Sequence, residues 1–388
     1  MTNAKRHAKC GRRSDFCYRR KMHELAFDPL SVRRILVVKL RHQGDVLLSS
    51  PVFKTLKNRL PHADIDALVY SDTREMLTEH PSVAMVHTID REWKHLGLIG
   101  QASAELKLIA ALRARHYDIV FHLTEHPRGA WLTRLLGPKL SVAPRATGMS
   151  EGRNSSWWRA SFTHTFPLPS TTFRHTVEQN LDALRRLGIH PTETEKKLVL
   201  VPGDAAERKV DALMATHGVQ AKRFIHMHPT SRWFFKTWPA EKFAELILQL
   251  GKQGDKVVLT AAPTADEREM IAAIKTHLKA PVIDLTGALS LKELAALTAR
   301  ARAFVGVDSA PMHIAAAMQT PTVALFGPSG EKHWGPWGVK FRVVASTRPE
   351  HSCRPCGNDG CGGSKVSDCL ISLPVTQVHD AINDLLAS

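Results

Sequence analysis

The sequence lacks a hydrophobic run long enough to span a membrane. Hydrophobic residues make up 43% of the chain, yet no stretch approaches the roughly 18 consecutive apolar residues that a transmembrane helix needs. The N-terminal segment is basic, but the apolar core of a signal peptide does not follow it. These absences argue against an integral membrane protein and against a secreted one, so we expect a cytoplasmic protein.

Acidic residues are also scarce relative to basic ones. The 388 residues include 37 Asp and Glu against 53 Lys and Arg, a formal net charge of +16. Such an excess favours a polyanionic partner: nucleic acid, an anionic membrane surface or a phosphorylated substrate. The basic residues are spread along the chain, and no helix-turn-helix, RRM or zinc-finger spacing occurs. The charge therefore favours a phosphorylated or membrane-bound partner over nucleic acid.

The chain is long enough for two domains, each with its own hydrophobic core. Residues 1–30 are rich in Lys and Arg and show little apolar periodicity. We expect them to form a disordered basic extension, in which Met22 offers an alternative start. We place the first domain at residues 31–190 and the second at 191–388, joined near 188–201.

The first domain opens with a βαβ pattern. The apolar periodicity predicts a strand buried on both faces, a helix and a second strand, at 35–40, 46–59 and 65–69. The first loop is not a GxGxxG sequence, which argues against a dinucleotide fingerprint. It instead places Asp45 at the carboxyl end of a strand, where open α/β sheets bind ligands. Asp45 is equally explained as the N-cap of the helix, and Lys39 and Arg41 could hold it ionised or contact phosphate.

The alternation continues through the rest of the first domain. The pattern predicts a strand at 117–123 and helices at 104–115, 129–136 and 175–187. Residues 144–175 lack clear periodicity and are rich in Arg, Ser and Trp. A long irregular loop of this kind is often functional. Its Arg145 and Arg153 could face a phosphorylated partner, or the loop could simply be solvated around buried Trp anchors.

The second domain repeats the same alternation. The pattern predicts strands at 224–228, 256–261, 282–285, 304–307 and 322–326, and helices at 239–250, 264–277 and 290–299. We expect a final helix at 375–386 that packs back across both domains. The fold class is therefore α/β, with two Rossmann-like parallel-sheet domains facing a central cleft.

The stretch from 303 to 327 contains a candidate anion site. A buried strand leads through Asp308 and Ser309 into a helix, and Pro311 lies in the first turn, where its missing N–H costs nothing. Free amides and the helix dipole make such an N-terminus attractive to anions. Asp308 and His313 could border this site. An ordinary β–α turn with a capping Asp and a packed His explains the same local pattern.

The loop at 229–238 should reach the same edge of the sheet, because it also leaves the carboxyl end of a strand. Thr230, Ser231 and Lys236 would then converge on the helix N-terminus at Ser309. Hydroxyl and amide donors with one or two cations can hold a diphosphate without a metal. The alternative is that Lys236 is a solvated loop residue.

Two further patterns suggest metals. Asp64-Ile65-Asp66 matches a DxD metal-nucleotide motif, but three residues at the start of an alternating strand match easily by chance. Four of the six cysteines are spaced C-x2-C-x4-C-x7-C and would suit a structural zinc: Cys353, Cys356, Cys361 and Cys369. Their second pair lacks the compact CxxC spacing of zinc ribbons, so we assign no metal.

Three segments together resemble one family. They are K-L-R-x-x-G-D at 39–45, P-T-S-R-x-x-x-K-x-W-P at 229–239 and G-V-D-S-A-P-M-H-I-A-A-A at 306–317. In this order they are similar to the bacterial lipopolysaccharide heptosyltransferases, glycosyltransferase family 9, and the resemblance covers about residues 32–385. Within the family, the segment R-H-Q-G-D-V-L-L-S-S-P is most similar to the heptosyltransferase III members.

The resemblance implies a GT-B fold with an acceptor-binding N-terminal domain and a donor-binding C-terminal domain. It implies inverting transfer of L-glycero-D-manno-heptose from ADP-heptose to the phosphorylated inner core of lipopolysaccharide on lipid A. The product would carry a branching third heptose on the second core heptose. The enzyme would work peripherally on the inner face of the inner membrane, an anionic surface, without a divalent metal or other cofactor and without nucleic acid.

The same resemblance implies roles for individual residues. Asp45 would be the general base, Lys236 would steady the diphosphate, and Asp308 would hydrogen-bond the heptose. Leu289 would lie against the adenine. Further contacts to the diphosphate would come from Thr230, Ser231, Ser309, Ala310 and His313.

Two sets of residues are matched less directly. The loop at 262–267 should reach the nucleoside through Thr264 or Asp266. We assign acceptor binding to the basic residues near the first cleft wall: Lys39, Arg41, Arg145 and Arg153.

Two other functions stay open at this point. One is another GT-B sugar-nucleotide enzyme, such as an epimerase. The other is a basic, zinc-containing nucleic-acid-binding protein, which predicts steeply salt-dependent binding and stoichiometric zinc.

Overall fold

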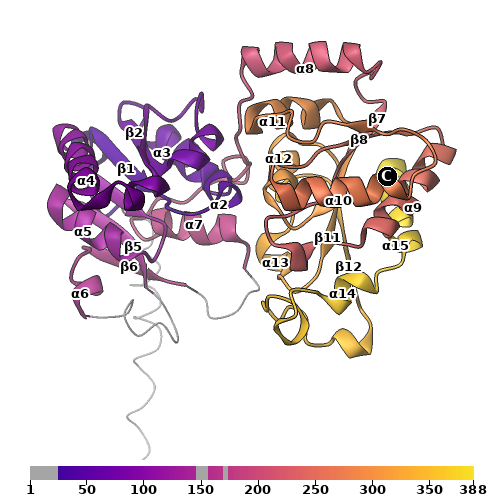
Figure 1. The fold of residues 1–388 in the computed structure, drawn as a ribbon. Helices are drawn as coiled ribbons and strands as arrows, with labels where there is room; N and C mark the ends of the chain where they lie inside the picture. The colour runs from indigo at the N-terminus through magenta and orange to yellow at the C-terminus, as the bar shows by residue number, and fades with distance from the viewer. Residues whose placement is uncertain (1–24, 146–155, 169–173) are drawn as a thin grey trace, which may run out of the picture.

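The structure is a computed structural model that describes residues 25–145, 156–168 and 174–388. Two α/β halves lie side by side, and each is built on a six-stranded parallel sheet (Figure 1). The predicted fold class is confirmed. The extension predicted at residues 1–30 lies largely outside the described residues. No helix in the described ranges has both the length and the apolar character needed to cross a bilayer.

The N-terminal sheet has the order β3-β2-β1-β4-β5-β6. Its strands are β1 (Arg34–Val38), β2 (Asp64–Tyr70), β3 (Met85–Ile89), β4 (Ile119–His122), β5 (Leu140–Arg145) and β6 (His164–Pro167). The sequence pattern predicts β1, β2 and β4, which are apolar and central. It misses the edge strands β3 and β6, which are only half buried and show no continuous apolar run. It also misses β5, which is buried between β4 and β6 but interrupts its apolar residues with Ser141 and Pro144.

The helices of this half are α2 (Gln43–Leu47), α3 (Ser50–Arg59), α4 (Gly97–Ala114), α5 (Pro127–Leu136), α6 (Ser156–Arg159) and α7 (Thr176–Arg185). The described part of this half also contains the 3-10 helices η1 (Pro29–Ser31), η2 (Ser71–Met76) and η3 (Arg91–His95). The single helix predicted at 46–59 is wrong. It is two helices, because Pro51 near the start of α3 has no N–H with which to continue α2.

The long loop predicted at 144–175 is also wrong in part. The described residues of this stretch include the end of β5, the short helix α6 and the strand β6. Val142 of β5 pairs with His164 of β6, and Trp158 of α6 is fully buried with its indole N–H donating to the Pro144 carbonyl oxygen at 3.1 Å. These pairings join short elements that have no periodicity of their own.

The C-terminal sheet has the order β12-β11-β10-β7-β8-β9. Its strands are β7 (Phe224–His228), β8 (Lys256–Leu259), β9 (Ile283–Asp284), β10 (Ala303–Val307), β11 (Thr322–Phe326) and β12 (Phe341–Ala345). Around it lie α8 (Asp204–Thr216), α9 (Ala240–Lys252), α10 (Ala265–Thr276), α11 (Leu291–Arg300), α12 (Ala310–Ala317), α13 (Glu331–Trp334), α14 (Asp368–Ile371), α15 (Val375–Ala387), η5 (Phe234–Lys236), η6 (Pro349–His351) and η7 (Cys361–Gly363).

The sequence analysis predicted that the last helix packs across both halves, and this prediction is wrong. The apolar face of α15 joins the core of the C-terminal half, where Val378, Ile382 and Leu385 are fully buried. It packs beside α9 and against β11 and β12. Its strongly amphipathic pattern specifies burial of one face but not which neighbour covers it.

The two sheets share one strand order. In each sheet the central pair joins the first strand to the fourth, β1 beside β4 and β7 beside β10. Helices leave such a pair in opposite directions, which opens a crevice at the carboxyl ends of the strands. The segments that follow β1, β7 and β10 border these two crevices. The same segments carry the three motifs that resemble those of the family.

The Asp64-Ile65-Asp66 motif is structural. The Asp66 carboxylate is fully buried and accepts hydrogen bonds from the Arg115 guanidinium at 2.7 Å and the Tyr117 hydroxyl at 2.8 Å. Hydrogen bonds from His87, Arg115 and Tyr117 lower its pKa, although burial opposes them. This network ties β2 to the end of α4 and does not line the cleft.

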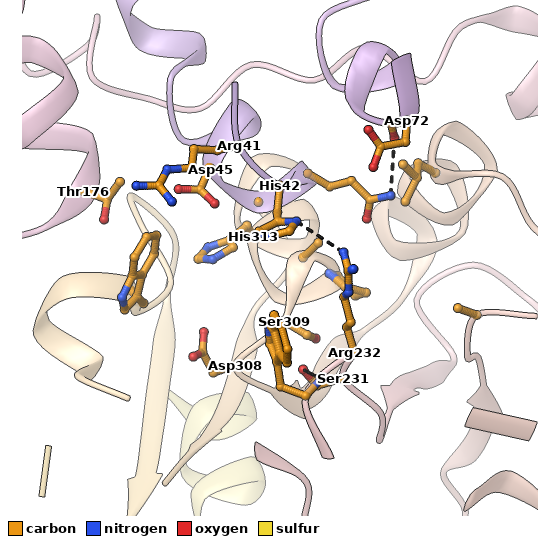
Figure 2. A pocket seen from close by; sticks show the side chains of 18 of the residues that line it. Arg41, His42, Asp45, Asp72, Thr176, Ser231, Arg232, Asp308, Ser309 and His313 are labelled. Carbon is orange, nitrogen blue, oxygen red and sulfur yellow. Dashed lines mark hydrogen bonds between the residues drawn. The ribbon is translucent and has the colours of Figure 1, made fainter. Parts of the chain in front are cut away.

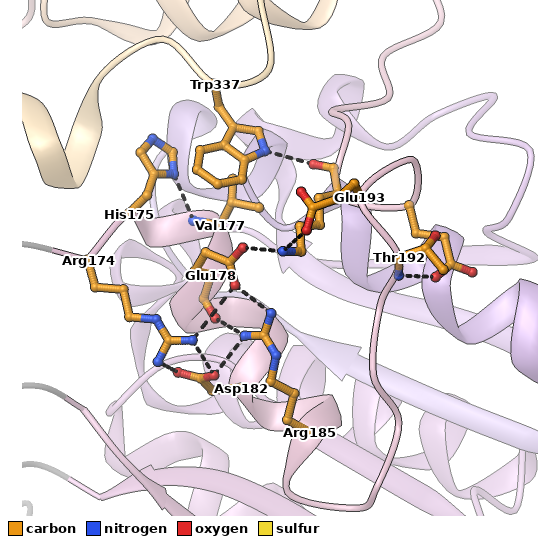
Figure 3. A network of polar contacts seen from close by, with 11 residues as sticks. Arg174, His175, Val177, Glu178, Asp182, Arg185, Thr192, Glu193 and Trp337 are labelled. Carbon is orange, nitrogen blue, oxygen red and sulfur yellow. Dashed lines mark hydrogen bonds and ion pairs between the residues drawn. The ribbon is translucent and has the colours of Figure 1, made fainter. Parts of the chain in front are cut away.

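The halves contact each other at the start of α7 (Figure 3). The His175 ring stacks on Trp337 with 4.4 Å between the ring centroids, and the Trp337 indole N–H donates to the Lys196 carbonyl oxygen at 2.8 Å. Behind this contact, Glu178 and Asp182 of α7 are surrounded by the cations of Arg174, Arg185 and Lys196. The network stiffens the helix that holds one end of the cleft.

Candidate functional site

A cleft of about 1180 Å³ lies between the two halves. The loops and helix starts that follow β1 and β4 line one side, and those that follow β7, β8 and β10 line the other. Figure 2 shows Arg41 and Asp45 on the N-terminal side, opposite Ser231, Asp308 and Ser309 of the C-terminal side. The three sequence motifs thus meet in one cavity.

Asp45 lies in the first turn of α2, whose N-cap is His42. The N-cap alternative for Asp45 is therefore wrong. The carboxylate is half-buried in the cleft wall and has no hydrogen-bond or ion-pair partner within the described ranges. The oxygens of this carboxylate are therefore free for a ligand, and the first turn of a helix is a favourable place for a negative charge.

Only some of the basic residues predicted to bind the acceptor line the cleft. Lys39 lines the cleft but is only 5% exposed, and its ammonium donates to Asn180 Oδ1 at 3.0 Å. Burial lowers its pKa to about 8, although the Asp45 carboxylate opposes this shift. Arg41 is exposed in the cleft, whereas exposed Arg145 does not line it. Arg153 lies outside the described residues.

Gly44 allows α2 to approach α12 of the other half. A Cβ at this position would lie 2.8 Å from Cδ2 of the His313 ring, closer than side chains pack. His313 is buried, and its Nδ1 has no hydrogen-bond partner in the part of the chain that the structure describes. Burial lowers its pKa, against the opposing effect of Asp308 and Asp45. A neutral imidazole therefore lies between the two sides of the cleft, with one ring nitrogen unused.

On the C-terminal side, Lys236 and Asp308 form an ion pair. The Lys236 ammonium lies 2.7 Å from Asp308 Oδ2, and both side chains are largely buried. Lys236 ends η5, and the loop around it is anchored by Trp238, whose indole N–H donates to the Leu373 carbonyl oxygen at 3.1 Å. The charge pair is thus held at a fixed place in the cleft wall.

The N-terminus of α12 is open to a ligand. Ser309 is its N-cap, but the hydroxyl makes no capping hydrogen bond with the first-turn amides. The neighbouring helix α11 differs, because Ser290 and Glu293 form a complete capping box there. Uncapped amides at a helix start can bind an anion. Of these two helix starts, α12 is the one with a first-turn amide left for a ligand among the described residues. That amide is the Ala310 N–H, because Pro311 has no N–H and the Met312 N–H donates to the Ser309 carbonyl oxygen at 3.1 Å.

Two predicted donor residues have different environments. The Thr230 hydroxyl donates to Glu267 Oε2 at 2.6 Å, so only its backbone can serve a ligand. Ser231 Oγ accepts a hydrogen bond from the Trp233 amide at 3.3 Å, which leaves its own hydrogen free to donate. Both residues line the cleft, as do Ser309 and Ala310.

In the loop at 262–267, one of the two residues predicted to reach the nucleoside does not line the cleft. Asp266 is exposed and does not line the cleft, while Thr264 does. The buried carboxylate of this segment is Glu267, which also accepts from the Ala262 amide at 2.8 Å. Sequence reasoning missed Glu267, because the register of a loop against its neighbours is not visible in the loop itself.

One end of the cleft is apolar. Leu289 lies there and packs against the cores of both halves. The surrounding lining residues are also apolar: Ala261, Pro263, Leu285, Leu291 and Leu294. Gly287, at φ +70°, makes the turn before Leu289 and packs against Pro263. A flat, weakly polar ring would fit between these side chains.

Arg232 and His42 cross the cleft, and sequence reasoning gave neither a role. The Arg232 guanidinium reaches His42 Nδ1 at 3.5 Å, and the His42 ring meets Trp233 edge-on at 6.5 Å between centroids (Figure 2). Arg232 is part of the P-T-S-R motif, so the motif itself was the available signal. The contact brings an extra cation to the mouth of the cleft.

The described residues contain no group of three or more His, Cys, Asp or Glu side chains placed to hold a metal ion. Cys353, Cys356 and Cys361 are exposed, Cys369 is buried, and all four are free thiols. Burial raises the pKa of the Cys369 thiol, and the nearby thiols of Cys361, Cys356 and Cys353 raise it further. The arrangement of these four cysteines therefore does not support the zinc alternative.

Comparisons with known proteins agree with the geometry. Residues 105–361 match the family model of glycosyltransferase family 9 (heptosyltransferase). The chain is 36% identical to lipopolysaccharide heptosyltransferase 3 of Escherichia coli K12 over 301 residues, which cover 77% of this chain and 83% of that protein.

Two solved structures share the fold. One is a glycosyl transferase family 9 protein from Veillonella parvula, with a TM-score of 0.77, 24% identity and coverage of 93% and 99% of the two chains. The other is the E. coli heptosyltransferase WaaC with ADP, with a TM-score of 0.68, 20% identity and coverage of 91% and 99%. The fold is thus GT-B, and the chain belongs to glycosyltransferase family 9, the heptosyltransferases.

Proposed function

We propose that this lipopolysaccharide-core heptosyltransferase transfers L-glycero-D-manno-heptose from ADP-heptose with inversion at the anomeric carbon. The carrying observation is the cleft itself. A free carboxylate, Asp45, faces a fixed Lys236–Asp308 pair and the open N-terminus of α12. A base on one wall and a diphosphate site on the other are the two parts that a single displacement requires.

Asp45 is the proposed general base. The acceptor hydroxyl must lose its proton as it attacks the anomeric carbon, and a carboxylate within hydrogen-bond reach can accept it. The oxygens of Asp45 have no partner within the described ranges, so the acceptor hydroxyl does not compete with a hydrogen bond already made. The same carboxylate would favour the positive charge that develops on the sugar ring in the transition state.

The leaving ADP would be held by the opposite wall. Its diphosphate gains negative charge as the bond to the sugar breaks. Lys236, the Ser231 hydroxyl and the Ala310 amide at the start of α12 would stabilise that charge. Asp308 would turn from Lys236 alone toward a hydroxyl of the heptose. The adenine would occupy the apolar end beside Leu289. The ADP bound to the structural neighbour WaaC supports this choice of nucleotide.

The N-terminal wall would bind the acceptor. Lys39 and exposed Arg41 supply positive charge beside Asp45, which suits the phosphates of the lipopolysaccharide inner core on lipid A. The identity with lipopolysaccharide heptosyltransferase 3 supports the second core heptose as acceptor and a branching third heptose as product. An acceptor anchored in lipid would place the enzyme peripherally on the anionic inner face of the inner membrane.

The test is transfer from ADP-heptose to lipopolysaccharide that ends at the second heptose. Mass spectrometry of the product should show one added heptose, and NMR of the new linkage should show inverted configuration. Because positive groups of the protein would neutralise the diphosphate, EDTA should leave the rate unchanged. Transfer to an acceptor lacking the second heptose, retention of configuration, or loss of activity in EDTA would each contradict the corresponding part of the proposal.

A further inference from the structure

Large hydrophobic side chains are exposed in one region outside the cleft. Of the 13 that are exposed in the described part of the chain, six lie between residues 91 and 136. Leu98 and Ile99 are 89% and 87% exposed, Leu106 is 66% exposed and Trp131 is 58% exposed. The remaining two are Leu96 and Leu135. Single exposed leucines are ordinary, but such a concentration marks an interaction surface.

Helix α4 is apolar on both of its faces. Leu108 and Leu112 point inward and are buried against the sheet. Leu98 and Ile99 in its first turn and Leu106 two turns later are exposed instead, and alanines continue this outer side. A helix that packs on one side only normally carries polar residues on the other. The exposed side of α4 therefore carries large apolar side chains that no described residue covers, next to the polar Ser103, Lys107 and Arg113.

Helix α5 extends this surface. It packs beside α4 on the outer side of the N-terminal half, away from the C-terminal half (Figure 1). Trp131 and Leu135 are one turn apart and both exposed. The Trp131 ring lies against Trp157 of α6, with 5.1 Å between centroids. We call the exposed side chains of Leu96, Leu98, Ile99, Leu106, Trp131 and Leu135 the outer patch.

The charges around the outer patch are mainly positive. Four exposed basic residues of η3, α4, α5 and α6 have no carboxylate within salt-bridge distance among the described residues: Lys94, Lys107, Arg134 and Arg159. The carboxylate of Glu105 is occupied by Arg128. Apolar side chains and Trp surrounded by Lys and Arg are the features of a surface that lies in the interface of an anionic bilayer.

The outer patch is continuous with the acceptor wall of the cleft. Arg91, the first residue of η3, donates to the Arg41 carbonyl oxygen at 3.2 Å and stacks over the Tyr70 ring. Helix α5 starts directly after Thr124 and Glu125, which line the cleft. A sugar chain fixed to a lipid could therefore enter the cleft while the outer patch rests on the membrane.

We propose that the outer patch docks this heptosyltransferase on an anionic lipid bilayer. Leu98, Ile99, Leu106 and Trp131 enter the boundary between headgroups and acyl chains, and the four basic residues contact lipid phosphates. The placement of the acceptor rests on the proposed function, but the docking itself does not. Vesicle binding without donor or acceptor tests it separately.

The experiment is cosedimentation with vesicles of phosphatidylcholine alone and of phosphatidylcholine with phosphatidylglycerol. The wild type should bind the anionic vesicles, more weakly as salt rises. The double variant Leu98→Ser/Ile99→Ser removes only exposed apolar groups and should bind about tenfold more weakly or worse. Leu30→Ser is the matched control, because Leu30 is 74% exposed on η1 outside the patch, and it should bind like the wild type. Equal binding by wild type and double variant would overturn the proposal.

A second copy of the chain is the competing occupant of the patch. If the double variant converts a dimer into a monomer in sedimentation velocity and still binds vesicles normally, the docking proposal is wrong. Activity then separates this inference from the proposed function. The double variant should keep full activity on a deacylated, soluble acceptor and show a raised KM on the same acceptor in vesicles. If the protein bound vesicles through the patch but transferred heptose to neither acceptor, the docking proposal would stand and the proposed reaction would be wrong.

Discussion

The two walls of the cleft differ in how far their polar groups are already paired. On the C-terminal wall, Lys236 is bound to Asp308 and Thr230 to Glu267. On the N-terminal wall, the Asp45 carboxylate is free of partners among the described residues and Arg41 is exposed. A prearranged wall suits a nucleotide that is the same in every turnover, since its dipoles need no reorganisation. An unpaired wall keeps its charges for the group that reacts.

The largest loss of activity should come from replacing the unpaired carboxylate of the N-terminal wall, Asp45. Asp45→Asn keeps the size of the side chain but removes the proposed general base, and kcat should fall by about 10²–10⁴-fold. ADP affinity, measured by calorimetry, should stay unchanged. Asp204→Asn is the control, because Asp204 is also an acidic first-turn residue but is exposed on α8. A variant with near wild-type kcat would show that another group accepts the proton.

The next largest loss of activity should come from removing Lys236, the cation of the ion pair on the C-terminal wall. Lys236→Met leaves the buried Asp308 carboxylate without its ion-pair partner and removes a cation from the proposed diphosphate site. We expect kcat to fall by about 10²–10³-fold, together with weaker ADP binding and a lower Tm.

The double variant Lys236→Met/Asp308→Asn separates the two contributions. It removes the unpaired charge, so Tm should recover while ADP affinity stays low. If ADP affinity recovered together with Tm, Lys236 would matter for stability and not for the diphosphate.

A third change alters the distance between the walls. Gly44→Ala places a methyl group where only 2.8 Å separates it from the His313 ring, so α2 must move away from α12. A displacement of about 1 Å in a site can cost up to 10²-fold, and we expect kcat/KM to fall by about 10- to 100-fold. Gly251→Ala is the control, because Gly251 also lies in a helix and no atom lies within 4 Å of the point that its Cβ would occupy. Unchanged kcat/KM would show that the close approach is unnecessary.

The smallest expected effect is on stability, and it comes from Lys39, the buried cation of the N-terminal wall. The pKa of Lys39 is lowered from 10.5 to about 8 by burial. Between pH 8 and 10.5 the unfolded chain therefore binds more protons, and this group makes the free energy of unfolding rise with pH. Lys39→Met should lack this contribution, so the difference from wild type should grow in favour of wild type across that window. Parallel urea-denaturation curves over the window would contradict the shifted pKa.

Much of the site could be predicted from sequence because three motifs follow strand ends. Asp45, Lys236 and Asp308 follow β1, β7 and β10, and parallel strands bring their carboxyl ends to one edge. The cleft contains these residues together with Ser231, Ser309 and His313. Their chemical roles stay predictions, since proximity alone does not establish turnover.

Other features could not be predicted because they depend on contacts between distant segments. The role of Glu267 arises from its register against Thr230, and the glycine at 44 is explained only by the ring of His313, far along the chain in the other half. The short strand β5 pairs with β4 on one side and with the edge strand β6 on the other. Spacing also suggested zinc, but the positions of the four cysteine side chains do not form a metal-holding group among the described residues.

The sequence by itself determined the class of fold and the three segments that build the cleft, because strand periodicity and helix-start residues act over a few neighbours. Only the tertiary structure decided which polar groups are paired, which helix start is open, and which apolar side chains stay exposed among the described residues. Those outcomes depend on burial and on distances of a few ångströms between residues far apart in the chain, which local patterns do not contain.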